Sequence, residues 1–128
     1  FIDKMNEDYD LITLHDIYFY ANFAEYNNIL VHLHAEKHFG LCRTVNKRVL
    51  DKVGWNMWPQ YKNKGLDALA RRTIEPKVQT WAIVEDAKVF DVKSTQNINR
   101  FSCWLRKCPQ VDPNIFFDCL SEEEKNLL

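Results

Sequence analysis

TLHDIYFYANFAEYNNILVHLHAEKHF, residues 13–39, is the stretch on which the fold class of this chain depends. Its large apolar side chains recur at spacings of four, three, four and three residues, which is the period of one face of an α-helix. They are Phe19, Phe23, Tyr26, Leu30 and Leu33. Thr13 stands at a capping position with Asp16 three residues later, and Gly40 follows the stretch as a helix terminator. This pattern predicts one long helix over residues 13–39.

The same stretch also has features of a β-hairpin. Residues 17–26 and 29–35 can form two strands joined at Asn27-Asn28, and the alternation Val31-His32-Leu33-His34-Ala35 suits a strand. We favour the helix because its start and stop signals coincide with the apolar stripe. The choice between helix and hairpin for residues 17–35 nevertheless stays open in the sequence.

The rest of the chain is predicted to be mostly helical. Two β-rich runs, residues 80–84 and 88–92, flank Glu85-Asp86-Ala87 and predict one β-hairpin. Apolar periodicity and capping residues predict further helices over residues 46–57, 66–74 and 95–107, one opened by Asp112-Pro113, and one opened by Ser121 with Glu124.

These elements predict a mainly α fold with one β-hairpin, within the α+β class. A length of 128 residues and a hydrophobic content of 46% suit a compact single domain over residues 1–128. The order of helix, helix and hairpin across residues 44–92 resembles a winged helix, which implies a second helix that enters a DNA major groove. Because the chain begins with Phe1 and not with Met, we expect it to be a domain excised from a longer chain.

Positive charge is concentrated in the middle of the chain. Residues 43–77 hold nine Lys and Arg against three Asp and Glu, with Trp55, Trp58 and Tyr61 among them, whereas residues 1–42 hold two against seven. Such a charge step attracts phosphates or an acidic partner. The favoured interpretation is therefore a nucleic-acid-binding surface.

The roles within that surface follow from the residue types. Lysines and arginines would neutralise phosphates, Arg71 and Arg72 could reach base edges, and the aromatic rings could stack on unpaired bases. The candidate nucleic-acid-binding residues are Lys47, Arg48, Lys52, Trp58, Lys62, Lys64, Arg71, Arg72 and Lys77.

Two other interpretations of these surfaces stay open. The cations could be the ordinary solvated face of amphipathic helices, or they could bind an acidic protein. Alternatively, the chain is a protein–protein interaction domain that meets a partner, or a second copy of itself in a homo-oligomer, through one helix face. That face would consist of Phe19, Phe23, Tyr26, Leu30 and Leu33.

Three histidines lie close together in sequence, at His32, His34 and His38. On a helix, His34 and His38 lie one turn apart and could chelate zinc, whereas on a strand all three would share a face with Glu36. A third ligand to the helical pair would have to be Cys42, His15 or a more distant residue. Surface histidines without a ligand are the simpler interpretation, so we keep His34 and His38 as weak metal candidates and expect no cofactor.

The cysteines fit a reduced protein. Cys42, Cys103, Cys108 and Cys119 are predicted to be free and mostly buried thiols, and Cys108 falls on the apolar side of the helix predicted over residues 95–107. A disulfide between Cys108 and Cys119 is the alternative.

No catalytic pattern stands out in the sequence. A glycine-rich phosphate loop, a Gly-x-Ser-x-Gly elbow and a dinucleotide fingerprint are all missing. No apolar run approaches the roughly 20 residues of a membrane helix. We therefore favour a binding domain over an enzyme and expect no membrane partner. A zinc-dependent hydrolase centred on His34 and His38 stays open as a further alternative. We expect the chain inside the cell, in the nucleus or the cytoplasm.

Overall fold

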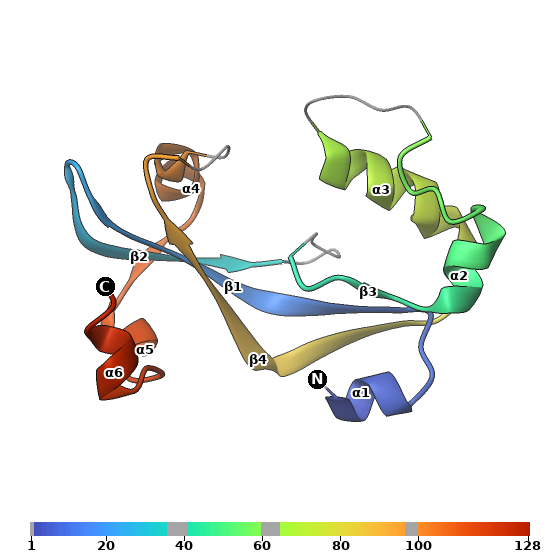
Figure 1. Cartoon of the computed structure of the whole chain (residues 1–128), viewed down its shortest axis with the longest axis horizontal. Coiled ribbons are helices and arrows are strands. Elements are labelled where there is room, and N and C mark those ends of the chain that lie inside the picture. Colours follow the sequence, from blue (N-terminus) through green and yellow to red (C-terminus); the bar gives the residue numbers. More distant parts are fainter. Residues whose placement is uncertain (1, 36–40, 60–64, 97–99) are drawn as a thin grey trace. The chain divides into compact units, whose positions relative to one another are not determined.

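The structure, a computed structural model, describes residues 2–35, 41–59, 65–96 and 100–128. It contains a five-stranded sheet with strand order β3-β1-β2-β5, in which β4 also pairs with β1 (Figure 1). The chain is therefore a mixed α/β protein, and the prediction of a mainly α-helical fold is wrong. In chain order the elements are α1 (Ile2–Asn6), β1 (Leu11–Phe23), β2 (Tyr26–His34), β3 (Thr44–Val45), α2 (Lys47–Lys52), α3 (Leu66–Ile74), the 3-10 turn η1 (Glu75–Lys77), β4 (Trp81–Lys93), α4 (Phe101–Lys107), β5 (Gln110–Val111), α5 (Asn114–Phe117) and α6 (Glu122–Lys125).

The stretch predicted as a long helix over residues 13–39 forms antiparallel strands instead. β1 and β2 pair in a hairpin in which Asp16 lies opposite His34. The strand interpretation of the sequence is thus the correct one. The turn lies at residues 24–25, however, and not at Asn27-Asn28.

The helical spacing in this stretch has a physical cause. Residues 17–21 of β1 are all buried, so both faces of the strand are covered. A strand buried on both faces is a continuous apolar run and does not alternate between apolar and polar residues. Such a run contains helical spacings as well as strand spacings, so its periodicity alone does not identify it.

The winged-helix-like element order is also wrong. The hairpin predicted at residues 80–84 and 88–92 is a single strand of 13 residues, β4, and Glu85-Asp86-Ala87 continue it. Glu85 and Asp86 point to opposite faces of the strand, and both side chains are exposed. Without a two-stranded wing, the helices α2 and α3 do not belong to a winged helix.

Several helices agree more closely with the sequence. α3 has the predicted bounds Leu66–Ile74. α2 is shorter than the predicted 46–57, but Asn46 caps it by accepting a hydrogen bond from the Arg48 backbone N–H at 3.0 Å. Ser121 and Glu124 form the predicted capping box.

The last helices also follow their local signals. The helix predicted over residues 95–107 is shorter in the structure, where α4 begins at Phe101, and residues 97–99 lie outside the described part of the chain. The Asp112 carboxylate accepts a hydrogen bond from the Asn114 backbone N–H at 3.0 Å, so Asp112-Pro113 leads into α5 as expected. Among the described residues, no helix is long and apolar enough to cross a bilayer.

The chain forms two compact units, and the strands β1 and β4 each continue from one into the other. Unit 1 consists of residues 1–15 and 36–87, and unit 2 consists of residues 16–35 and 88–128. Each unit has its own buried cluster, so each is described by itself.

Unit 1 packs α2 and α3 around the start of β1. Leu11, Val49 and Ile74 form its buried cluster, and partly buried apolar side chains surround them. Asp10, the residue that precedes β1, has a buried side chain. The Asp10 carboxylate accepts hydrogen bonds from the Arg48 guanidinium and from the backbone N–H groups of Gln79, at 2.7 Å, and Thr80, at 3.2 Å.

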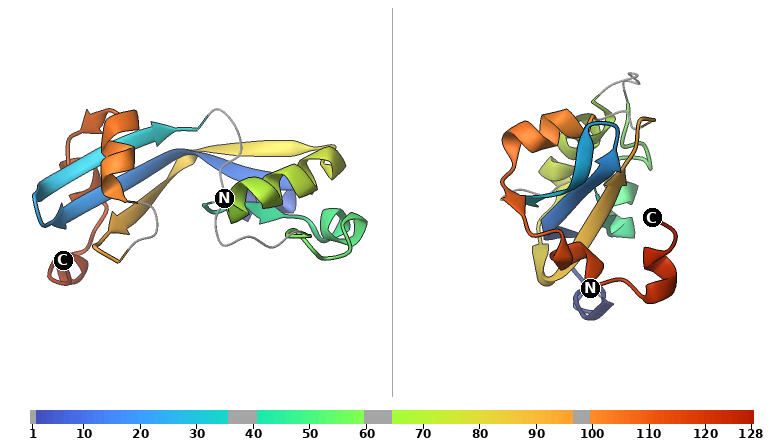
Figure 2. Two further views of the ribbon diagram at one scale, coloured as in Figure 1. Left: turned by 90° about the horizontal axis from the view of Figure 1, so that it is seen from above. Right: turned by 90° about the vertical axis from the view of Figure 1, so that its left-hand side faces the viewer.

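Unit 2 has helices on both faces of its part of the sheet (Figure 2). Neighbouring residues of a strand point to opposite faces, so Tyr18 and Tyr20 lie on one face and Phe19 on the other. Tyr18 and Tyr20 belong to a cluster with Phe116 of α5. Phe19 stacks on Trp104 of α4, with ring centroids 4.2 Å apart and planes inclined by 9°.

A β-bulge at the hairpin end of β2 changes which face a residue occupies. The register between β1 and β2 shifts between Ala21 and Phe23, and Asn28 has a φ of 51°. One extra residue in a strand reverses the facing beyond it. Tyr26 therefore contacts Phe101 of α4, with ring centroids 4.9 Å apart.

Candidate functional site

Two exposed tryptophans follow α2 in unit 1. The side chains of Trp55 and Trp58 are 60% and 43% exposed. α2 ends in a left-handed turn, in which Gly54 has a φ of 65° and Trp55 a φ of 61°. The Trp55 backbone N–H donates to the Leu50 carbonyl at 2.8 Å, which terminates the helix. A bulky residue in the left-handed region is a genuine outlier that costs about 1 kcal/mol or more, so this turn holds Trp55 in an unfavourable conformation.

Each of the two indoles donates a hydrogen bond from its ring N–H. Trp55 Nε1–H donates to Asp51 Oδ1 at 2.8 Å, and Trp58 Nε1–H donates to the Leu66 carbonyl at 3.1 Å. Lys47 contacts the same Asp51 carboxylate at 3.0 Å, and its Nζ lies 5.9 Å from the Trp55 ring centroid. The hydrogen bond from Trp55, followed by that from Lys47, lowers the pKa of Asp51. These bonds limit the rotation of both rings while much of their surface stays exposed.

Among the described residues, the predicted nucleic-acid-binding cations divide into those with an acidic partner, Lys47 and Arg48, and those without one. Arg48 is engaged by acidic partners: its Nη1 lies 2.7 Å from Asp8 Oδ1, and its Nε contacts Asp10. Lys52, Arg72 and Lys77 are exposed, Arg71 is half-buried, and none of these four takes part in an ion pair among the described residues. Lys62 and Lys64 lie outside the described residues.

The charge step in the sequence does not become a charge step between the two units. Unit 1 brings the acidic residues 1–15 together with the basic segment, and it contains eleven Lys and Arg against ten Asp and Glu. The positive character is therefore local, at the exposed lysines and arginine of the segment 47–77.

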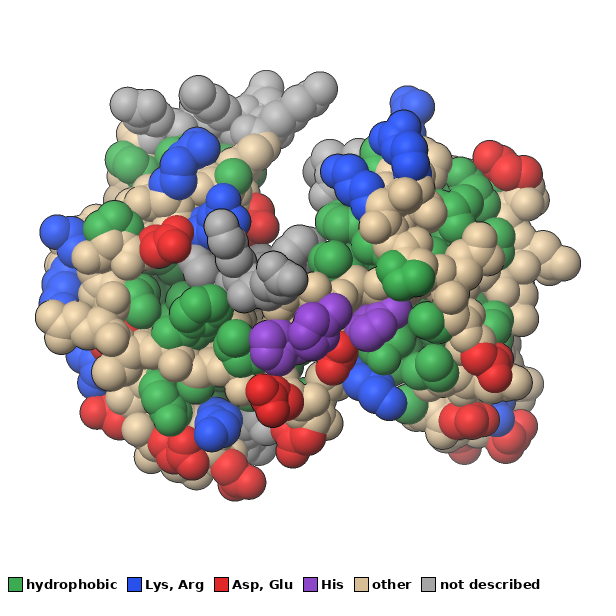
Figure 3. Space-filling view, turned by 180° about the vertical axis from the view of Figure 1, so that it is seen from behind, with side chains coloured by type: hydrophobic (Ala, Val, Ile, Leu, Met, Phe, Trp, Pro, Cys, Tyr) green, Lys and Arg blue, Asp and Glu red, His purple; other side chains and the backbone are tan. Residues whose placement is uncertain are grey.

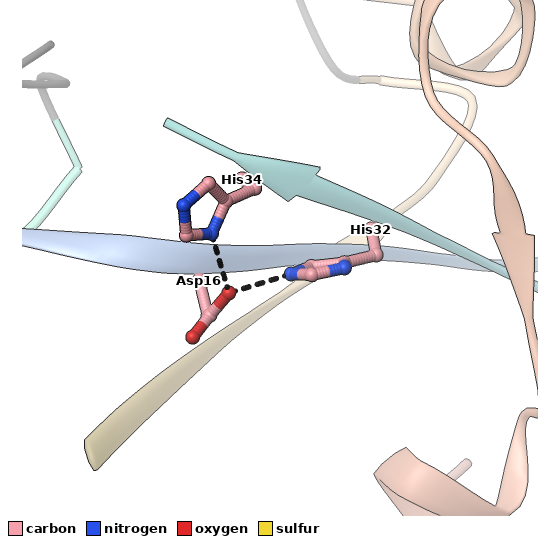
Figure 4. A group of neighbouring side chains, drawn as sticks. All are labelled: Asp16, His32 and His34. Carbon is pink, nitrogen blue, oxygen red and sulfur yellow. Dashed lines mark hydrogen bonds and ion pairs between the residues drawn. The ribbon is translucent and has the colours of Figure 1, made fainter. Parts of the chain in front are cut away.

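A second cluster lies on the hairpin of unit 2, where Asp16, His32 and His34 meet (Figure 4). Asp16 Oδ1 lies 2.7 Å from His32 Nε2 and 3.2 Å from His34 Nδ1. The strand register explains the meeting, because Asp16 lies directly opposite His34, and Tyr18 lies opposite His32 on the same face. Figure 3 shows histidine side chains reaching the surface of the molecule.

The surroundings of this cluster hold it in place. The His32 ring stacks on Tyr18, with centroids 4.5 Å apart and planes inclined by 13°. Tyr18 in turn stacks on Phe90 at 5.0 Å. Burial raises the pKa of Tyr18, and the nearby Asp16 charge adds to that effect.

The Asp16 carboxylate is ionised more readily than an ordinary aspartate. Its partial burial is the largest single influence and favours the protonated form, but the hydrogen bonds from His32 and His34 together outweigh it and lower the pKa of Asp16. A carboxylate and two imidazole nitrogens, with ligand atoms all within 4.8 Å of one another, are a set of groups that can hold a metal ion.

No family model, no curated protein and no solved structure matches this chain.

The sequence located the histidine cluster only in part. The sequence marks His34 as a metal candidate and places His32 beside it only on a strand, whereas its helical interpretation makes Asp16 part of a capping box. The register of the hairpin was the missing signal, since it places Asp16 across from His34. His38, the other predicted ligand, lies outside the described residues.

The predicted partner-binding stripe is part of the sheet and not a helix face. Phe19 and Leu30 are almost completely buried, and they lie on opposite faces of unit 2. Phe23, Tyr26 and Leu33 are partly buried strand residues. These five side chains therefore do not form one exposed surface.

All four cysteines are free. Cys108 is buried, as its place on the apolar side of the predicted helix indicated, and burial raises the pKa of its thiol. Cys103 is partly buried, whereas Cys42 and Cys119 are exposed.

Proposed function

We propose that this chain is a non-catalytic binding module for single-stranded nucleic acid. In this proposal Trp55 and Trp58 stack on unpaired bases, and Lys52, Arg72 and Lys77 contact phosphates. The observation that carries the proposal is the pair of exposed indoles, each fixed at its N–H edge by a hydrogen bond. Stacking of a base on an aromatic side chain contributes about 1–3 kcal/mol and accepts any base.

The charges near the tryptophans favour nucleic acid over an apolar protein partner. Lys52 is exposed in the short helix that precedes Trp55, and Lys47, which is paired with Asp51, lies beside the Trp55 ring. Exposed tryptophans combined with lysines and arginines are the usual composition of a groove for single strands. An interface for an apolar protein surface would instead be depleted of lysine.

Single strands are favoured over a duplex because residues 81–93, where a two-stranded wing was expected, form one strand in the described part of the chain. Arg71 is half-buried, and Arg48 is occupied by Asp8 and Asp10. A helix that reads a major groove needs several side chains free to reach base edges. A nucleic-acid ligand and four free cysteines both suit a protein located inside the cell.

Fluorescence anisotropy tests this proposal. A labelled single-stranded oligonucleotide and the matching duplex are titrated with protein at two salt concentrations. We expect tighter binding to the single strand and a clear loss of affinity at the higher salt concentration, because phosphate contacts release counterions. Trp55→Ala and Trp58→Ala should each weaken binding at least about fivefold.

A matched charge control separates a defined surface from general attraction. Lys52→Ala with Arg72→Ala should reduce both affinity and salt dependence. Arg106→Ala with Lys107→Ala removes the same two charges from exposed positions on α4 of unit 2 and should leave binding unchanged. Equal losses in the two pairs, or no binding to any oligonucleotide at low salt, would overturn the proposal. The second result would point to a protein partner at Trp55 and Trp58.

A further inference from the structure

The hairpin of unit 2 offers a group of metal-ligating side chains that the proposed function does not use. Asp16 lies on β1 and His32 and His34 on β2, and the strand register directs all three to one face of the sheet. Backbone pairing between β1 and β2 holds the three residues in place. The group therefore does not depend on a flexible loop.

The spacing of the ligand atoms fits a small divalent ion. In a tetrahedral zinc site the ligands lie about 2.0–2.2 Å from the ion, which places them roughly 3.3 Å from one another. Asp16 Oδ1 lies 2.7 Å from His32 Nε2 and 3.2 Å from His34 Nδ1. All three ligand atoms lie within 4.8 Å of one another, so side-chain rotations that bring the two ring nitrogens closer to the tetrahedral spacing would let all three contact one ion.

Exposure differs across the cluster in a way that suits an open site. The side chains of Asp16 and His32 are about three-quarters buried, with 23% and 25% exposure, whereas that of His34 is 59% exposed. An ion can thus reach the ligands from the side of His34. Three protein ligands leave at least one coordination position for water.

The orientation of His32 is set before any ion binds. Tyr18 stacks on its ring, and Phe90 stacks on Tyr18. A ligand whose orientation is fixed by packing loses less freedom on binding than a mobile surface histidine.

We propose that Asp16, His32 and His34 bind one divalent transition-metal ion of the zinc class, with water in the remaining coordination positions. Two imidazoles and one carboxylate match zinc and its neighbours in the first transition row, whereas calcium and magnesium prefer oxygen ligands. Each imidazole binds the ion as the neutral ring, through the nitrogen that faces Asp16, and its single proton is on the other ring nitrogen.

Calorimetric titration of the chelator-treated protein with Zn²⁺ tests the site. We expect one Zn²⁺ per chain and no heat of binding with Mg²⁺. His34→Ala should lower the affinity at least about tenfold, because it removes one of three protein ligands. His34 is exposed enough that this variant should keep the fold, which circular dichroism checks.

Matched variants and Co²⁺ substitution make the test specific. Asp16→Asn should weaken binding in the same way as His34→Ala. Asp112→Asn, which changes an exposed carboxylate elsewhere in unit 2, should not. The absorption spectrum of the Co²⁺-loaded protein should lack the charge-transfer band of a thiolate ligand. Unchanged Zn²⁺ affinity in both site variants, binding in excess of one ion per chain that His34→Ala does not reduce, or a thiolate band would each overturn the proposal.

Discussion

Asp10 and Arg48, which are 38 residues apart in sequence, form an ion pair that joins the start of β1 to α2. The Asp10 side chain is only 3% exposed. Its Oδ2 atom accepts hydrogen bonds from the backbone N–H groups of Gln79 and Thr80, which precede β4. Three segments of unit 1 therefore meet at one carboxylate. The same contact explains why Arg48, although it belongs to the basic segment 43–77, is not one of the unpaired cations.

Asp10→Asn should destabilise the protein by about 1–3 kcal/mol. The change removes the charge that pairs with Arg48 and weakens the hydrogen bonds from Gln79 and Thr80, whereas Arg48 keeps its ion pair with Asp8. Equilibrium unfolding in urea measures the effect. Asp86→Asn, at an exposed position of the same unit, is the control and should change stability by less than about 0.5 kcal/mol. Equal stability of the two variants would show that Asp10 does not connect the segments energetically.

The contribution of Asp10 should disappear in acid. Burial is the largest influence on this carboxyl and opposes its ionisation, but hydrogen bonds from Arg48, Gln79 and Thr80 outweigh burial and lower the pKa of Asp10 in the folded protein. The folded pKa is thus below the unfolded value of about 3.9, so the stabilisation is complete above that value. It is lost as the pH falls through the folded pKa. Urea unfolding of the wild type and Asp10→Asn over a pH series should give a stability difference that is constant near neutrality and shrinks below about pH 4. A difference that grows in acid would contradict this sign.

Stability measurements also distinguish core residues from a docking surface in the predicted stripe. Phe19 is 1% exposed and stacks on Trp104, whereas Phe23 is only partly buried near the hairpin turn. Phe19→Ala should lower the free energy of unfolding by about 3–5 kcal/mol, as expected for a large side chain removed from a core. Phe23→Ala should have a clearly smaller effect in the same urea titration. If both changes left the free energy of unfolding unaltered, the predicted partner-binding stripe would be an exposed surface and not part of the core.

The sequence predicted those elements whose signals are local. The capping residues Asn46 and Ser121 lead into α2 and α6, and Pro76 lies just beyond α3. These features involve residues only a few positions apart, so one sequence is enough to recognise them. Elements that depend on distant packing were the ones predicted wrongly. Both faces of β1 are covered by segments far along the chain, and nothing local reveals that cover.

The candidate sites follow the same division. Trp55 and Trp58 lie within the basic segment that the sequence indicates, because charge and aromatic content are properties of a single stretch, whereas the exposed Trp81 lies outside it. The histidine cluster cannot be recognised without the pairing of β1 and β2. The helical interpretation places Asp16 in a helix cap and His34 next to His38. Once the register is known, Asp16 and His34 are neighbours.

The left-handed turn at Trp55 allows stability and binding to be separated. Trp55→Gly and Trp55→Ala both remove the indole, but only glycine adopts a φ of 61° without strain. We therefore expect the glycine variant to be more stable than the alanine variant by about 1 kcal/mol in urea unfolding. Both variants should bind single-stranded oligonucleotide equally weakly, at least about fivefold below the wild type. A glycine variant that retained wild-type binding would mean that the turn, and not the ring, contacts the nucleic acid. Loss of binding in both variants, with stability ordered as expected, would indicate that the turn keeps an unfavourable conformation in order to present the ring, as strained residues at functional sites often do.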